Sequence, residues 1–412
     1  MLLRYLKKIF YNSVAELRWY IPVMTFVVSL SACLGSGDET IVLEEGKPAH
    51  GIPSDDDADP NPEIGTSTTY IPNVNYTVEN SGNDAIVRLD MTGIQDPDSY
   101  EWLKLVGTGG NGVNQQNVWV SVDGKPKGIA VYNNSDNQGE NAIMVDVVFL
   151  VDNSGSMGDE ADGIARDIVT WAGELSASDI DVKFGCVGYG GNVGRQYGSL
   201  VNGYGVTGAL NITDYMELNN FLNNRSVTNT SRTKGYAGDD TSELYTIAEN
   251  SYSRAGGECG VQALRFADEH FSFRLGANRV YVNFTDDANY PGGDDEISVS
   301  YVADAMNWNT NKGTIHTVFS GSSSSLNYSI GEAPWLLSEY TGGTVMEVSP
   351  TFSGVTLNSL PVTGAMQNSY IIRFTNVSEF MDGQSHEVKV TILSEDGRVR
   401  AEKIFYIVFG TV

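Results

Sequence analysis

The chain has 412 residues, a length that allows two or three domains. Its composition is that of a globular protein rich in turns, with 41% hydrophobic residues, 19% charged residues and 45 glycines. The formal net charge of −27 argues against nucleic acid and anionic lipid surfaces as partners. The histidines are His50, His270, His316 and His386, and their scatter argues against a histidine zinc site or a Ser-His-Asp hydrolase.

Residues 1–32 have the pattern of a secretory signal peptide. Basic residues precede an apolar stretch from 20 to 30, which is short for a bilayer span. The stretch ends in Leu30-Ser31-Ala32-Cys33, which resembles the lipobox of bacterial lipoproteins. The resemblance implies lipidation of Cys33 and, because Leu34 is not aspartate, an outer-membrane lipoprotein of the cell envelope, periplasmic or surface-exposed. An ordinary signal peptide or a membrane anchor is the alternative.

Residues 33–69 are predicted to form an acidic, disordered tether. The segment combines prolines with an acidic run at Asp55, Asp56, Asp57 and Asp59, and it has few residues that would form a core. A calcium loop is the alternative interpretation of the acidic run.

Segments 70–141 and 349–412 have the alternating pattern of β-strands. Strands are expected at 85–91 and 117–122 in the first segment, and at 369–374, 387–393 and 401–408 in the second. Asp-Gly pairs between several of these runs predict turns. Together the two segments are expected to make one all-β sandwich with the central region inserted; two separate small β domains are the alternative.

Between residues 142 and 348 the expected strands and helices alternate. Strands are predicted at 145–151, 181–189, 279–286, 314–319 and 344–348, and helices at 160–175, 214–223, 260–273, 296–308 and 332–340. This alternation predicts an α/β domain with a doubly wound, mostly parallel sheet and helices on both faces.

The first strand of this domain leads directly into a polar turn. Its apolar run, 147–151, suits a strand buried on both faces, and the residues that follow include Asp152, Ser154 and Ser156. Ligands of open parallel sheets bind beyond the carboxyl ends of the strands. A carboxylate and two hydroxyls are hard oxygen donors, which favour Mg²⁺ or Mn²⁺ over zinc. A helix-capping turn is the alternative.

Three motifs in this domain resemble those of the von Willebrand factor type A (VWA) family. They are Asp152-Asn153-Ser154-Gly155-Ser156, Gly256-Gly257-Glu258 with Ala263-Leu264 downstream, and Phe284-Thr285-Asp286. The resemblance extends over the whole domain, which is about half the chain. The resemblance implies a six-stranded, Rossmann-like sheet with a metal-ion-dependent adhesion site (MIDAS) for Mg²⁺, Mn²⁺ or Ca²⁺. It assigns the metal to Asp152, Ser154, Ser156 and Asp286. The family has threonine where this chain has Glu258, which is a candidate ligand that could bind the cation directly, bind it through a water or point away, and Thr241 is an alternative donor.

The family resemblance implies metal-dependent adhesion or protein–protein interaction, with a carboxylate of an unidentified protein ligand completing the metal shell. The alternative is a structural or assembly subunit of an envelope or pilus-type complex, in which the cation only stabilises the fold. An enzyme is not expected, because no neighbouring histidine or lysine activates the serines. The sequence does not decide whether Cys186 and Cys259 form a disulfide. A pair of cysteines in an exported protein can form one, but a cysteine within a strand is usually buried and inert.

Overall fold

The computed structural model describes residues 51–64, 72–81, 84–96, 98–134, 143–158, 160–178, 180–190, 205–226, 244, 247, 255–321, 331–350, 357–360 and 362–410. The expected signal peptide, Cys33 and Thr241 lie outside these ranges. Within them, no helix combines the length and apolar character needed to cross a membrane.

The central part of the chain forms a six-stranded sheet with the order β11-β10-β9-β6-β7-β8. Its strands are β6 (Met144–Asp152), β7 (Asp181–Tyr189), β8 (Val206–Thr213), β9 (Asn278–Thr285), β10 (Thr314–Ser320) and β11 (Val345–Val348). Neighbouring strands pair in parallel, except that β8 pairs antiparallel with β7 at one edge. β6 pairs on both sides, and its side chains from Val145 to Asp152 are buried on both faces, which explains why its sequence is a continuous apolar run.

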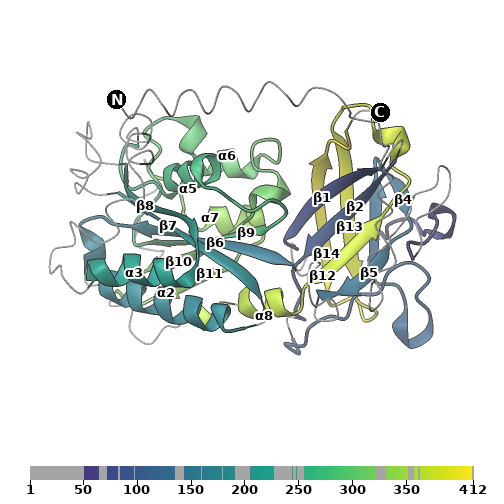
Figure 1. The fold of residues 1–412 in the computed structure, drawn as a ribbon, viewed down its shortest axis with the longest axis horizontal. Coiled ribbons are helices and arrows are strands. Elements are labelled where there is room, and N and C mark those ends of the chain that lie inside the picture. The colour runs from purple at the N-terminus through teal and green to yellow at the C-terminus, as the bar shows by residue number, and fades with distance from the viewer. Residues whose placement is uncertain are drawn as a thin grey trace, which may run out of the picture. The chain divides into compact units, whose positions relative to one another are not determined.

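The side chains of β6 alternate between two hydrophobic cores. Figure 1 labels the sheet and the helices that accompany it. The helices of this part are α2 (Ala161–Ser176), α3 (Tyr215–Ser226), α5 (Gly260–His270), α6 (Val299–Ala303) and α7 (Leu336–Thr341). Val147 and Phe149 share a core with α2 and α3, whereas Val148 and Leu150 share a core with α5, α6 and α7. Successive side chains of a strand point to opposite faces of its sheet. The central part is therefore an α/β unit around a mostly parallel sheet.

The prediction of a single helix at 296–308 is wrong. The structure has a short 3-10 turn, η6 (Asp295–Ile297), then α6, which ends at Ala303. Ser298 is the N-cap of α6, and the carboxylate of Asp304 accepts the backbone N–H of Met306 in the following turn. Such side-chain bonds compete with the helical pattern and divide the segment.

The flanking segments form two antiparallel sheets, β1-β2-β12-β5 and β14-β13-β3-β4. Their strands are β1 (Val74–Ser81), β2 (Asp84–Met91), β3 (Val118–Val122), β4 (Lys125–Lys127), β5 (Ala130–Asn133), β12 (Tyr370–Phe374), β13 (His386–Leu393) and β14 (Arg400–Ile407). Each sheet contains strands from before and after the central part, and both contribute to one hydrophobic core. Strands that precede and strands that follow the central part therefore pair in the same two antiparallel sheets, which together form the β unit.

Part of the expected tether packs against this β unit. Asp55 forms an ion pair with the buried Lys127 at 2.9 Å, and the side chain of Asn61 hydrogen-bonds β13. Ile52 and Ile64 are only 4% and 7% exposed. The expectation of a disordered tether is therefore wrong for residues 51–64, because the buried Lys127 gives the acidic run a charge partner that composition did not reveal. The rest of 33–69 lies outside the described residues.

The hydrophobic core of the central unit extends beyond residue 348, where the sequence placed its end. The short helix α8 (Val362–Gln367) contributes Val362 and Met366 to the core that contains α2. In addition, Trp171 Nε1 donates a 2.9 Å hydrogen bond to Thr363. The segment leading into β12 is therefore packed against the α/β unit.

Candidate metal centre

Strands β6, β7 and β9 end at the same edge of the central sheet. Asp152 is the last residue of β6, Tyr189 the last of β7 and Thr285 the last of β9. Because these strands are parallel, their carboxyl ends lie together. This brings Asp286, which is 130 residues from Ser156, into direct contact with it.

Two serine hydroxyls and one carboxylate form a chain of close oxygen contacts. Ser154 Oγ lies 3.1 Å from Ser156 Oγ, and Ser156 Oγ donates a hydrogen bond of 3.0 Å to Asp286 Oδ1. Ser154 is buried, Ser156 is exposed and Asp286 is half-buried. The oxygen cluster therefore has a closed inner side and an open outer side.

Asp152 is oriented by two hydrogen bonds at the buried side of this cluster. Its Oδ1 accepts the backbone N–H of Ser154 at 2.8 Å, and its Oδ2 accepts the hydroxyl of Thr285 at 2.9 Å. The sequence did not single out Thr285 as a site residue. A hydroxyl at the end of an otherwise apolar strand, directly before Asp286, is the signal that would have found it.

Glu258 lies beside Asp152, and Gly190 permits the approach. A Cβ on Gly190 would come within 3.0 Å of Asp152 Oδ1 and 3.2 Å of Glu258 Cγ, and its φ of +75° also favours glycine. The Glu258 carbonyl accepts the backbone N–H of Tyr290 at 2.8 Å, which fixes the loop. The structure therefore places the residue that replaces the family's threonine next to the expected metal ligands.

Burial and acidic neighbours raise the pKa values of Asp152 and Glu258. Burial, followed by the charges of Glu258 and Asp286, raises the pKa of Asp152 well above its usual range. Burial also raises the pKa of Glu258, and the charges of Asp287 and Asp286 add to this effect. Acids that disfavour one another's ionised form are electrostatically suited to a bound cation.

The donor set combines hydroxyls with carboxylates. Across the described part of the chain, no three or more His, Cys, Asp or Glu side chains are grouped so that they could hold a metal ion. In the cluster above, two of the closely spaced oxygens belong instead to Ser154 and Ser156. Hydroxyl and carboxylate oxygens are ligands that suit hard cations such as Mg²⁺.

A second layer of hydrogen bonds holds the loop after β9. Asn289 accepts the backbone N–H of Val261 at 3.2 Å and donates to Glu332 at 2.9 Å. The hydroxyl of Tyr290 donates to Asp287 at 3.0 Å; burial, together with this acidic neighbour, raises the pKa of Tyr290 to about 12. The loop that carries Asp286 is thus tied to α5 and to the segment before α7.

Cys186 and Cys259 are both buried, and neither takes part in a disulfide. The reason is their placement, since Cys186 lies in the core that contains α2 and Cys259 in the core that contains α5. Burial raises the pKa of Cys259 to about 12, which favours an inert thiol.

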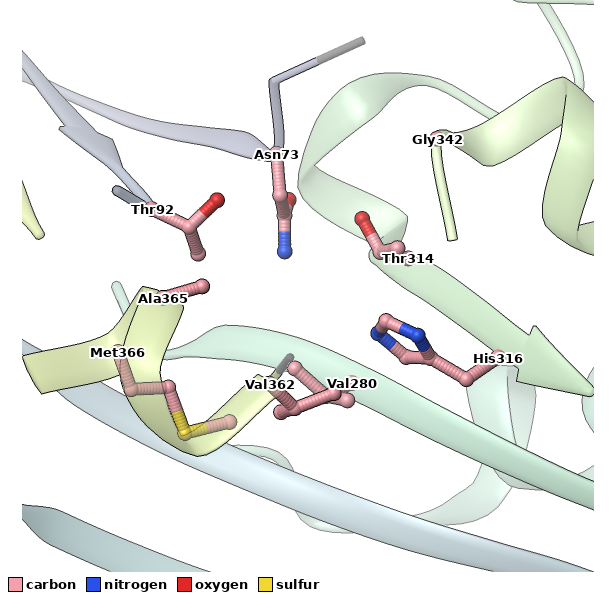
Figure 2. Close-up of a pocket in the computed structure, with 9 residues that line it drawn as sticks. All are labelled: Asn73, Thr92, Val280, Thr314, His316, Gly342, Val362, Ala365 and Met366. Atoms are coloured by element: carbon pink, nitrogen blue, oxygen red, sulfur yellow. The ribbon is translucent and has the colours of Figure 1, made fainter. Parts of the chain in front are cut away.

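A separate cavity lies at the other end of the sheet, beside the first residues of β9 and β10. It is lined by Asn73, Thr92, Val280, Thr314, His316, Gly342, Val362, Ala365 and Met366. Figure 2 shows the His316 ring and the Asn73 carboxamide directed toward its centre. The ring of His316 accepts the backbone N–H of Thr344 through Nδ1 at 3.0 Å. Burial lowers the pKa of His316 to about 4, so this histidine is neutral near pH 7.

No family model matches the chain, and no curated protein matches it. Several solved structures are similar to the chain at low sequence identity, among them the following three. The mussel byssus proximal thread matrix protein 1 with a zinc-occupied MIDAS motif is 11% identical over 60% of this chain and 50% of its own, with a TM-score of 0.32. The pilus adhesin SpaC from Lactobacillus rhamnosus GG in an open conformation is 10% identical over 83% of this chain and 49% of its own, with a TM-score of 0.32. The human COPII-coat protein Sec24c is 9% identical over 86% of this chain and 57% of its own, with a TM-score of 0.29. The chain thus spans about half the length of these structures, and scores this low assign it to no family.

Proposed function

We propose that the central part of the chain is a doubly wound VWA-type domain whose MIDAS binds Mg²⁺ and mediates metal-dependent protein–protein interaction or adhesion. The proposal is that of a binding module and not of an enzyme. Its support comes from the oxygen cluster at the carboxyl edge of the sheet, together with the motif resemblance.

The spacing of the oxygens carries the proposal. Mg²⁺ takes ligands in an octahedron at roughly 2.0–2.1 Å, so adjacent ligands are roughly 2.8–3.0 Å apart. The separations between Ser154 and Ser156, 3.1 Å, and between Ser156 and Asp286, 3.0 Å, are close to this edge length. Ca²⁺ binds six to eight oxygens at roughly 2.3–2.6 Å, and the larger number of ligands brings neighbouring oxygens to similar separations. The spacing therefore suits a hard divalent cation, and Mg²⁺ is the ion we propose.

The buried and the exposed residues of the cluster have different proposed roles. Ser154, Ser156 and Asp286 would hold the cation, and Asp152 would orient Ser154 from the buried side through its bond to the Ser154 N–H. The exposed Ser156 leaves the outer side of the cluster accessible to solvent. When bound, the cation would supply open coordination positions for an oxygen ligand of the partner.

Glu258 changes the charge of the site. Asp152, Glu258 and Asp286 carry three negative charges when ionised, which exceed the +2 of the cation. We infer that Glu258 strengthens cation retention and weakens the attraction for an acidic partner, so that neutral or basic groups are favoured. Its position next to Asp152 supports this inference.

Calorimetric titration with Mg²⁺ tests the proposed metal centre. Ser156→Ala and Asp286→Asn are expected to lower the Mg²⁺ affinity at least about tenfold, because each removes a donor. Asp162→Asn is the matched control, since Asp162 is an exposed acid in the first turn of α2. Wild-type affinity in both site variants would overturn the proposal.

The alternative function is a structural or assembly subunit in which the cation only stabilises the fold. The burial of Asp152 among other acids favours a stabilising contribution. Two measurements on the wild type and Asp286→Asn, each made with Mg²⁺ and with EDTA, separate the two functions. The first is the stability against unfolding, and the second is the capture of partner protein in a pull-down from intact cells. Capture that depends on Mg²⁺ at unchanged stability supports adhesion, whereas a loss of stability with capture unaffected supports the structural role.

We also propose that the protein is an envelope lipoprotein anchored through Cys33. The support is the lipobox-like sequence from Leu30 to Cys33, which follows an apolar stretch of signal-peptide length. Metabolic labelling with palmitate should mark the wild type and leave Cys33→Ser unlabelled. Equal labelling of both would contradict the anchor.

A further inference from the structure

Strand β14 is the edge of its sheet, and part of that edge is already paired with a side chain. The carboxamide of Asn309 donates to the carbonyl of Tyr406 at 2.9 Å and accepts its N–H at 3.5 Å. Both backbone groups of Tyr406 therefore point away from β13. In an antiparallel pair this orientation recurs at every second residue, so the groups of Ile404 and Glu402 also point outward. Within the described ranges these outward groups form no hydrogen bond.

A groove of about 260 Å³ runs beside this unpaired edge. Glu402, Lys403 and Ile404 line one side of it, and residues of the α/β unit line the other, among them Trp308, Asn309 and Tyr340. Ile404 and Tyr340 are 40% and 41% exposed, which gives the groove an apolar rim. The groove thus combines free backbone groups with apolar surface.

Lys403 adds a positive charge without a partner. It lies on the same face of β14 as Ala401 and Phe405, which belong to the core of the β unit. In the described part of the chain no acidic group pairs with it, and burial lowers its pKa to about 8. Lys403 is half-buried, whereas the buried Lys127 forms an ion pair with Asp55. A partly desolvated ammonium without such a partner is destabilising, and a carboxylate from a ligand would offset this.

We propose that the edge of β14 binds an extended peptide segment of a partner protein that places a carboxylate opposite Lys403. The segment pairs with the backbone of Ile404 and Glu402 as the Asn309 carboxamide pairs with Tyr406. Side chains of an added strand alternate between the two faces, so the acid faces Lys403 and its neighbours face Ile404 and Tyr340. The recognised pattern is apolar, acidic, apolar. This site is separate from the cation centre and does not rest on it.

An inward lysine on an edge strand has another known use, which is to prevent unwanted pairing between sheets. The two roles differ in what removal of the charge does. If Lys403 only blocks pairing, Lys403→Met will self-associate and the wild type will bind no peptide. If Lys403 recognises a carboxylate, Lys403→Met will lose peptide affinity.

The test uses a capped heptapeptide of alternating valine and threonine with one central aspartate, and the same peptide with asparagine instead. Binding to the full chain is followed by calorimetry and by Trp308 fluorescence, in Mg²⁺ and in EDTA. The variants are Lys403→Met and Ile404→Pro; proline is tolerated where an edge N–H faces away from the sheet. Lys389→Met, a lysine of the neighbouring strand that contacts Glu402, is the control.

The expected result is binding of the aspartate peptide in both media, with affinity at least about tenfold lower for the asparagine peptide and for Lys403→Met. Ile404→Pro should abolish binding while thermal unfolding stays cooperative, and Lys389→Met should bind as the wild type does. Equal affinity for the two peptides, or no binding to the wild type, would overturn the proposal. So would concentration-dependent dimerisation of the wild type that is lost in Ile404→Pro, because it would assign the edge to a second copy of the chain.

Discussion

The hydroxyl of Thr285 donates a hydrogen bond of 2.9 Å to Oδ2 of Asp152, which links the end of β9 to the end of β6. Both residues are at most 2% exposed. The bond fixes the carboxylate whose other oxygen accepts the Ser154 N–H. The orientation of the serine loop thus depends on a residue of a neighbouring strand.

Thr285→Val is therefore expected to destabilise the fold. Valine has the same shape but lacks the hydroxyl, and a typical buried hydrogen bond contributes about 0.5–1.5 kcal/mol. Chemical denaturation measures the loss. Thr285→Ser keeps the hydroxyl and should lose less stability, while Mg²⁺ affinity should fall in the valine variant only. Equal losses in both variants would show that packing, and not the bond to Asp152, matters.

Glu258→Thr, which introduces the threonine of the VWA motif, is expected to lower Mg²⁺ affinity on the order of tenfold, because it removes one negative charge near the proposed cation. Glu258→Gln removes the same charge at nearly constant size and should behave alike. Calorimetry of Mg²⁺ binding and capture of partner protein from intact cells are the two measurements. Unchanged values for both in Glu258→Thr would remove the assigned role of Glu258.

His316 is expected to make the fold sensitive to acid. Its pKa is about 4 in the folded chain against an ordinary value of 6.5, so between these pH values the unfolded state binds a proton that the folded state does not. Stability should therefore fall as the pH drops from 6.5 to 4, by up to about 1.4 kcal/mol for each pH unit. Denaturation of wild type and His316→Asn across this window measures the difference. Parallel pH profiles for the two proteins would contradict the assignment.

His386 is expected to act in the opposite direction. Burial alone would lower its pKa, but its ring lies 2.7 Å from Asp123 and 2.9 Å from Asp382, and these carboxylates raise it overall. A histidine whose pKa is raised on folding stabilises fully below its unfolded pKa of about 6.5, and this contribution is lost as the pH rises through the folded value. His386→Gln should therefore be less stable than the wild type near pH 5 and approach it at higher pH. A gap that widens with pH would refute this.

Arg274→Met is expected to cost about 3–5 kcal/mol, because it leaves the fully buried Asp146 without its charge partner. The Nε of Arg274 lies 2.7 Å from Asp146, whose side chain is 0% exposed. Asp181 also contacts Arg274 but its side chain is 51% exposed, so Asp181→Ala should cost less than about 1 kcal/mol. Urea unfolding compares the two variants. Mg²⁺ affinity should stay unchanged in both, since Asp146 is near the start of β6 and Asp152 is at its end.

Most strands of the central sheet could be predicted because buried strands have recognisable apolar runs in their sequences. The expected strand at 181–189 is the observed β7, and that at 279–286 differs from β9 by one residue at each end. β8 and the short α8 were missed. The antiparallel edge strand β8 has a polar second half, and α8 has only six residues, so neither has a strong periodic pattern.

Local sequence patterns predicted that Asp152, Ser154, Ser156 and Asp286 lie at the ends of buried parallel strands, because hydrophobic runs and polar turns are features of short stretches of the chain. The contacts that orient these residues emerged from the folded chain alone. Two of these contacts join segments that are distant in sequence: the bond from Thr285 to Asp152 and the approach of Glu258 to Asp152 beside Gly190. The groove beside Lys403 is likewise lined by segments that are distant in sequence. Such contacts depend on strand order and register, which no local pattern encodes.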